Sequence, residues 1–156
     1  MSEDYRQRSI TPVVWYDDPN AALKWLEKAF GFETRMVVAD DSGGVIHSEC
    51  VLGDGYVMVV GPPREGRTSP ASNGGLSSQS IHVHLPDDID AHYARAKAAG
   101  ATITRDIADQ AYGDRVYICD DLEGHSWSFG QTLKAMTSEE MAQATGRKIT
   151  SSAGAD

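Results

Sequence analysis

Two pairs of side chains in this sequence have the types and the spacing to hold a metal ion or a polar ligand. His47 and Glu49 are two residues apart, and so are His82 and His84. Residues at positions i and i+2 of a strand point to the same face of the sheet. Two such pairs that converged could chelate a divalent cation, for which imidazoles favour zinc, iron or nickel. The alternative is that these histidines replace aromatic side chains on the half-polar wall of a cavity.

A second concentration of polar side chains occurs in residues 112–130, YGDRVYICDDLEGHSWSFG. If Val116 and Ile118 face the core, strand alternation places Arg115 and Tyr117 in a cavity. The guanidinium of Arg115 would then offer forked donors to a carboxylate or another oxyanion. The alternative is a surface ion pair of this arginine with a neighbouring carboxylate, that of Asp114 or Asp120.

The composition limits the classes of function. The 156 residues fit one domain, and 14 Lys and Arg against 23 Asp and Glu give a net charge of −9, which disfavours nucleic acid. No apolar run approaches the roughly 20 residues that span a bilayer, and the polar N-terminus lacks a secretory signal. With two cysteines, we expect a cytoplasmic protein that binds neither membrane nor nucleic acid. We find no nucleophilic triad or phosphate-loop motif.

An internal repeat explains much of the pattern. Sliding the sequence along itself by 69 residues superposes the only two cysteines, Cys50 and Cys119, and four pairs of glycines. The glycine pairs are Gly31 and Gly100, Gly44 and Gly113, Gly55 and Gly124, and Gly61 and Gly130. Such agreement indicates two copies of one supersecondary unit.

Each copy predicts a strand, a helix and three further strands. The first helix has Asp18 as N-cap and Pro19 at its first position, and it stops at Gly31. In the second copy, Asp88 is the expected N-cap and Gly100 the stop. We therefore predict an α+β fold in which two tandem βαβββ modules form a curled mixed sheet around a cavity.

The modules occupy residues 10–61 and 80–131 of a single domain. Residues 62–79 between them are rich in Gly, Pro and Ser and predict a surface linker or a lid. In residues 132–156, Thr137 and Glu140 form a capping-box pattern for one short helix, and a disordered tail follows.

Strand alternation also predicts which residues line the cavity. In SIHVHL the apolar side chains pack under the helices, so His82 and His84 point to the concave side. Trp15 takes the equivalent place in the first module. Trp127 and Phe129 bury in the core, which leaves Ser126 and Ser128 facing the cavity. The turn DDLEG, residues 120–124, joins two strands and requires no catalytic role.

The chain resembles the vicinal oxygen chelate superfamily, which includes glyoxalases, bleomycin-resistance proteins and extradiol dioxygenases. The resemblance covers residues 10–131 and rests on DDPNAALKWLEKAFGF, HSEC followed by GDG, DDIDAHYARAKAAGA and the W-S-F-G ending of the last strand. It implies two sheets curled around a cavity and a homodimer. The closest-looking branch is a glyoxalase/bleomycin-resistance-like group without a characterised role.

Metal-dependent members of that superfamily use a His or Gln near the start of each module and a Glu on its last strand. The first His position falls on Thr11 or Pro12, and the second falls near Ser80, two residues before His82. The Glu positions fall on Val59 and Ser128, so both carboxylates are missing.

These observations favour a protein that holds a small organic molecule without a cofactor. Its predicted ligand-binding residues are Trp15, His47, Glu49, His82, His84, Arg115 and Tyr117, with no metal ligands assigned. The alternative is a divalent-metal-dependent lyase, isomerase or dioxygenase in which His47, Glu49, His82 and His84 bind the ion. A third hypothesis is an interaction subunit that uses the C-terminal helix as its contact.

Overall fold

The computed structural model describes residues 8–152 and contains two modules of the same topology. The first module comprises β1 (Val13–Trp15), α1 (Pro19–Phe30), β2 (Glu33–Ala39), β3 (Val45–Leu52) and β4 (Gly55–Val60). The second comprises β5 (Ser80–His84), α2 (Ile89–Ala98), β6 (Thr102–Asp109), β7 (Asp114–Asp120) and β8 (Ser126–Thr132). A 3₁₀ turn, η1 (Pro70–Ser72), lies between the modules, and α3 (Ser138–Thr145) follows them. The predicted fold class and repeat are confirmed.

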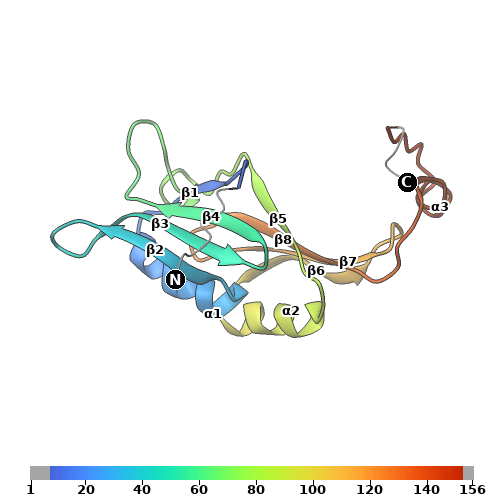
Figure 1. Cartoon of the computed structure of the whole chain (residues 1–156), viewed down its shortest axis with the longest axis horizontal. Helices are drawn as coiled ribbons and strands as arrows, with labels where there is room; N and C mark the ends of the chain where they lie inside the picture. Colours follow the sequence, from blue (N-terminus) through green and yellow to red (C-terminus); the bar gives the residue numbers. More distant parts are fainter. Residues whose placement is uncertain (1–7, 153–156) are drawn as a thin grey trace.

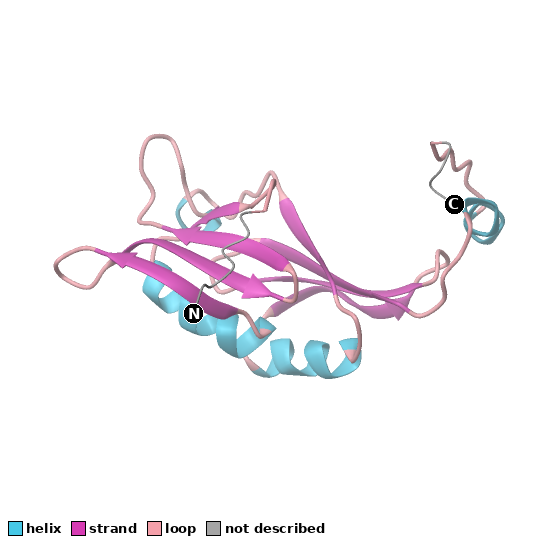
Figure 2. Ribbon diagram, in the orientation of Figure 1, coloured by secondary structure: helices cyan, strands magenta, loops and turns pink. Residues whose placement is uncertain are grey.

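Each module forms one four-stranded mixed sheet. The strand orders are β1-β4-β3-β2 and β5-β8-β7-β6, in which only the first pair of each sheet is parallel. Both sheets carry their helices on the same side, so α1 and α2 lie next to each other and the opposite face has no helical cover (Figures 1 and 2). We call this second side the open face.

The first helix forms for the local reasons that the sequence predicts. The carboxylate of Asp18 accepts a hydrogen bond from the amide of Ala21, Pro19 begins the helix, and Gly31 ends it with φ 81°. The second helix differs, because Asp88 adopts a left-handed φ of 54° and its side chain makes no capping hydrogen bond. The predicted role of Asp88 as an N-cap side chain is therefore wrong.

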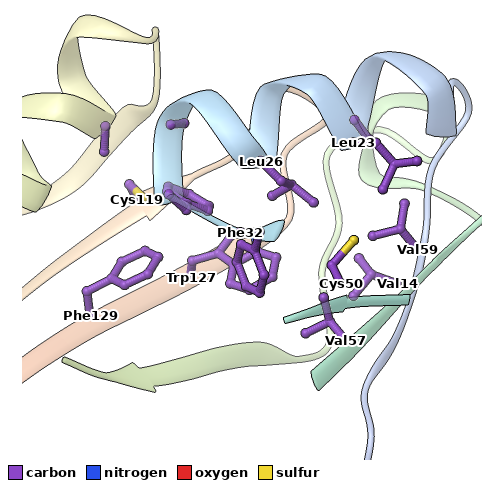
Figure 3. Packing of buried hydrophobic residues seen from close by; sticks show 14 of the residues in the cluster. Val14, Leu23, Leu26, Phe32, Cys50, Val57, Val59, Cys119, Trp127 and Phe129 are labelled. Carbon is purple, nitrogen blue, oxygen red and sulfur yellow. The ribbon is translucent and has the colours of Figure 1, made fainter. Parts of the chain in front are cut away.

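The core lies between the helices and the two sheets. Phe30 of α1 packs against Trp127 and Phe129, with ring centroids 5.4 and 4.7 Å apart, and all three are fully buried. Figure 3 shows how aromatic residues fill the second-module side while Val14, Cys50, Val57 and Val59 fill the first. The prediction that Trp127 and Phe129 bury in the core is correct, which makes Trp127 a packing residue.

The C-terminal helix has the predicted capping box. Thr137 Oγ1 accepts from the amide of Glu140, whose carboxylate accepts from the amide of Thr137. None of the helix residues is buried, and α3 lies apart from the sheets (Figure 1). Part of the tail that we predict to be disordered, residues 153–156, lies outside the described residues. Within the described chain, no helix is long and apolar enough to cross a membrane.

Candidate functional site

The residues of the predicted ligand-binding set occupy four different places in the structure. His82 and His84 line one pocket, Trp15 lines another, His47 and Glu49 lie on the open face, and Arg115 and Tyr117 lie on the helix side. A single chain therefore does not bring the seven side chains together.

His82 and His84 border a cavity of about 380 Å³ between the two modules, which we call the seam pocket. Its other walls come from the start of β4, the residue before β2 and the N-terminal segment. The lining residues are Arg8, Ile10, Pro12, Phe32, Leu52, Asp54, Gly55, Tyr56, Val57, Ile81, His82, Val83 and His84.

The orientation of His82 is set by strand β8. Its Nδ1 lies 2.6 Å from the Oγ of Ser128, its register partner, so both side chains lie on the open face as predicted. Gly130 provides the space for the imidazole: a Cβ there would lie 3.1 Å from Cε1 and 3.3 Å from Nε2 of His82. The ring is therefore held against the sheet by one hydrogen bond and one missing side chain.

Trp15 lies in a second cavity, of about 280 Å³, which the segment 67–79 covers. The carbonyl oxygen of Trp15 accepts a hydrogen bond from His125 Nε2 at 2.7 Å. Because a carbonyl only accepts, His125 carries its proton on Nε2. The predicted structural role of His125 is thereby made specific, since it ties the last turn to β1.

His47 and Glu49 are close to each other on β3, with His47 Nε2 3.8 Å from Glu49 Oε1. Both are partly exposed, and they pair across β4 with Val60 and Met58, so they lie on the open face. Neither residue lines the two cavities described above. Their role in ligand binding stays a prediction.

The predicted orientation of Arg115 and Tyr117 is wrong. Tyr117 is fully buried opposite Phe129, and its hydroxyl lies 2.7 Å from Nδ1 of His92 on α2. Arg115 forms ion pairs with Asp90 at 2.9 Å and Asp109 at 2.7 Å, and these bonds raise the pKa of its guanidinium. The surface ion pair is thus present, although its partners are neither Asp114 nor Asp120.

The physical reason is that β7 is apolar on both faces. Tyr117 and Cys119 are buried under the helices, while Val116 and Ile118 face the open side beside Gly130 and Ser128. Alternation alone could not distinguish the two faces of this strand.

The side chains of one chain do not fit the metal site that the superfamily resemblance implies. Among residues 8–152, no three His, Cys, Asp or Glu side chains gather as metal ligands do. At the two glutamate positions, Val59 is buried in the core and Ser128 bonds to His82. The cysteines add no thiolate, because burial raises the pKa of Cys50 to about 11 and that of Cys119 to about 12.

Two carboxylates of the turn 120–124 join the modules. Asp121 accepts from the Tyr16 hydroxyl at 2.6 Å, and Glu123 accepts from the amides of Asp17 and Asp18 at 2.7 and 3.0 Å. The acidic cluster in residues 112–130 is thus largely structural, as the prediction of a turn without catalysis required.

Several pocket residues were absent from the sequence-based set. Arg8, Phe32 and Tyr56 line the seam pocket, and Arg67 lines the cavity beside Trp15. They come from turns and linkers far apart in the chain and have no motif spacing. The two arginines of the predicted lid, Arg64 and Arg67, were the one available signal.

Known proteins share this architecture and this sequence pattern. The family model for the Glyoxalase/Bleomycin resistance protein/Dioxygenase superfamily matches residues 9–129. An uncharacterized protein of Mycobacterium bovis is 32% identical over 142 residues, covering 87% of this chain and 91% of its own. The crystal structure of TioX from Micromonospora sp. ML1 has a TM-score of 0.65 and 32% identity, and the alignment covers 83% of this chain and 100% of TioX.

A more distant structure supports the fold alone. The fosfomycin resistance protein FosX of Listeria monocytogenes has a TM-score of 0.61 at 14% identity, with 86% of this chain and 98% of FosX covered. The family match spans most of the residues, and both the strand order and the two-module repeat agree with it. The chain belongs to the Glyoxalase/Bleomycin resistance protein/Dioxygenase superfamily.

Proposed function

We propose that this protein binds and holds a small organic molecule in the seam pocket, without a metal ion. The observation that carries the proposal is the position of His82 and His84 at a cavity of about 380 Å³ with aromatic walls. That volume lies within the range of small-molecule sites, which combine apolar walls with a few fixed polar groups.

The pocket supplies both kinds of contact. Phe32 and Tyr56 offer aromatic surface, and Arg8 lies over the ring of Tyr56 with its guanidinium carbon 5.6 Å from the centroid. The imidazole of His82 is held by Ser128, so its remaining nitrogen can bond to a ligand without a large loss of rotamer entropy.

A second copy of the chain would complete the site by covering the open face. Val13 and Val38 lie on that face and are 50% and 46% exposed, beside the partly exposed His47 and Glu49. A sheet face with exposed valines is typical of a surface that another layer covers. A homodimer built in this way would bring the His47 and Glu49 pair of each chain towards a ligand. We place this homodimer in the cytoplasm, as the sequence predicts.

A metal-dependent lyase, isomerase or dioxygenase is the alternative, and the nearness of His47 to Glu49 favours it. One chain supplies only this pair, so a third ligand would have to come from elsewhere. The two functions differ in their dependence on a divalent ion, which makes them separable by experiment.

A thermal-shift screen of small organic molecules in the presence of EDTA tests the proposal. Compounds that stabilise the folded protein raise its melting temperature through binding, and we expect His82→Ala to abolish the shift. His47→Ala reports on the second copy: a reduced shift would place this pair at the ligand, and an unchanged shift restricts the site to the seam pocket. The proposal fails if His82→Ala leaves every shift intact.

A further inference from the structure

The segment 67–79, which we call the strap, is fixed to the body of the protein. Ser69 is fully buried, and its hydroxyl donates to Glu123 at 2.6 Å. Ser72 donates to the carboxylate of Asp17 at 2.6 Å. The residues predicted as a surface linker or lid therefore form a positioned wall, anchored to both modules.

Between the strap and the edge strands β1 and β5 lies the cavity of about 280 Å³ that contains Trp15, which we call the strap pocket. Trp15, Ile81, Leu76 and Pro70 give it an apolar surface. Hydroxyl and amide side chains of the strap lie at its rim. This combination suits a small molecule with a flat apolar body and a polar end.

The charge of the strap pocket is opposite to that of the whole protein. The chain has 23 acidic and 14 basic residues, yet the ionisable residues that line this pocket are Arg67 and His125 only. Arg64 adds a second guanidinium nearby, 5.9 Å from the centroid of the Trp15 ring. A cationic pocket without a carboxylate, in an acidic protein, favours an anionic ligand.

Arg67 is available for such a ligand. Its backbone amide donates to the carbonyl of Arg64 at 2.9 Å, which fixes the main chain of the strap. Its side chain forms no ion pair with any residue from 8 to 152. A guanidinium pairs with carboxylates and similar oxyanions through two parallel hydrogen bonds.

We propose that the strap pocket is a second binding site, which takes a small planar molecule that carries a carboxylate or a similar oxyanion. Arg67 binds the anionic group, and the body of the ligand packs between Trp15, Ile81 and Leu76. The site is separate from the seam pocket and does not depend on the function proposed for His82.

Titration with 2-naphthoate, followed by two-dimensional NMR of the indole N–H groups, tests this site. Trp25 and Trp127 serve as internal references, because their indoles donate to the Ala99 carbonyl and to Asp121. We expect the Trp15 signal to shift on titration while the other two stay in place. Naphthalene-2-carboxamide and 2-naphthylmethylammonium provide the neutral and cationic isosteres, which should bind more weakly.

Arg67→Gln should weaken 2-naphthoate binding about tenfold or more, since a charge-assisted hydrogen bond is lost. The substitution keeps the backbone bond to Arg64. Arg35→Gln removes the same charge at an exposed site paired with Glu33 and should leave the affinity unchanged. The proposal is overturned if the cation binds as well as the anion, if Arg67→Gln binds normally, or if the Trp15 signal does not move. His82→Ala should leave this titration intact, so a failure of the seam pocket would not be confused with a failure here.

Discussion

The hydroxyl of Tyr16 donates a 2.6 Å hydrogen bond to the carboxylate of Asp121, which lies 105 residues further along the chain in the other module. The same carboxylate also accepts from the Trp127 indole at 3.0 Å and from the amides of Glu123 and His125. Burial, followed by the Asp121 charge, raises the pKa of the Tyr16 hydroxyl well above its usual value. A turn that could be read as catalytic therefore joins the modules.

Replacing Asp121 with Ala should destabilise the protein by about 3 kcal/mol or more. Asp121 is 5% exposed, and its loss leaves buried donors from Tyr16 and Trp127 without an acceptor. Urea unfolding monitored by tryptophan fluorescence measures the change. Leu122→Ala, at an exposed position of the same turn, is the control, and a loss below about 1 kcal/mol for Asp121→Ala would contradict the assigned role.

Stability should fall on acidification because of His92. Its Nε2 donates to the Phe30 carbonyl at 2.9 Å, and its Nδ1 accepts from Tyr117, so the ring is neutral in the fold. Burial lowers the pKa of His92 below its usual value, and the charge of Arg95 acts in the same direction. The unfolded chain therefore takes up this proton at a higher pH than the folded chain does.

The stabilising contribution of neutral His92 is complete above the unfolded pKa of about 6.5 and is lost as the pH falls towards the lower folded value. The free energy of unfolding between pH 7.5 and pH 5 should show this loss. His92→Gln should flatten the dependence in that window, whereas His84→Gln, at an exposed position of β5, should retain it. Equal slopes for the wild type and His92→Gln would count against the argument.

Gly130→Ala should disturb the seam pocket more than it disturbs the fold. The new Cβ would stand 3.1 Å from His82 Cε1 and 3.4 Å from Val116 Cγ2, so the imidazole has to move. We expect the hydrogen bond from His82 to Ser128 to break and the ligand-induced thermal shift to decrease. Overpacking of this kind costs about 1–3 kcal/mol. Ser128→Ala, which frees the imidazole without crowding it, should reduce the same shift, and normal shifts for both variants would oppose the assignment.

Ending the chain after Ala135 should leave the folded domain and its assembly intact. Helix α3 contributes no buried residue, and the shortened chain keeps the amides of Leu133 and Lys134 that donate to the Gly113 carbonyl. The free energy of unfolding should change by less than about 0.5 kcal/mol. Light scattering reports the oligomeric state. A dimer in the full chain that becomes a monomer on truncation would instead support the hypothesis of an interaction subunit built on this helix.

The fold could be predicted because its signals are local or repeated. Asp18 and Pro19 begin α1 through side-chain and backbone chemistry within one turn, and the repeat of 69 residues doubles every strand pattern. The repeat failed in one place. Cys50 pairs with Val57 and Cys119 with Trp127, so the last strands are offset by 70 residues. One extra residue in the turn 121–125 reverses which positions of β4 and β8 correspond.

The candidate site was harder to predict because its residues come from distant segments. His82 could be placed on the open face, since the apolar partners Ile81 and Val83 alternate with it. Arg115 could not be placed, because its partners Asp90 and Asp109 lie on another helix and another strand. The walls contributed by Tyr56 and by Arg67 depend on how the modules meet, which no short sequence pattern encodes.

The most direct test of the central claim is to measure ligand-induced thermal shifts of untagged protein in EDTA, and again after loading with zinc, iron(II), nickel or manganese. If the protein holds its ligand without a metal, the same compounds should stabilise it equally in all conditions, and His82→Ala should remove the effect in each. Shifts that appear only with one divalent ion, and that disappear in His47→Ala, would contradict the account and identify a metal-dependent site.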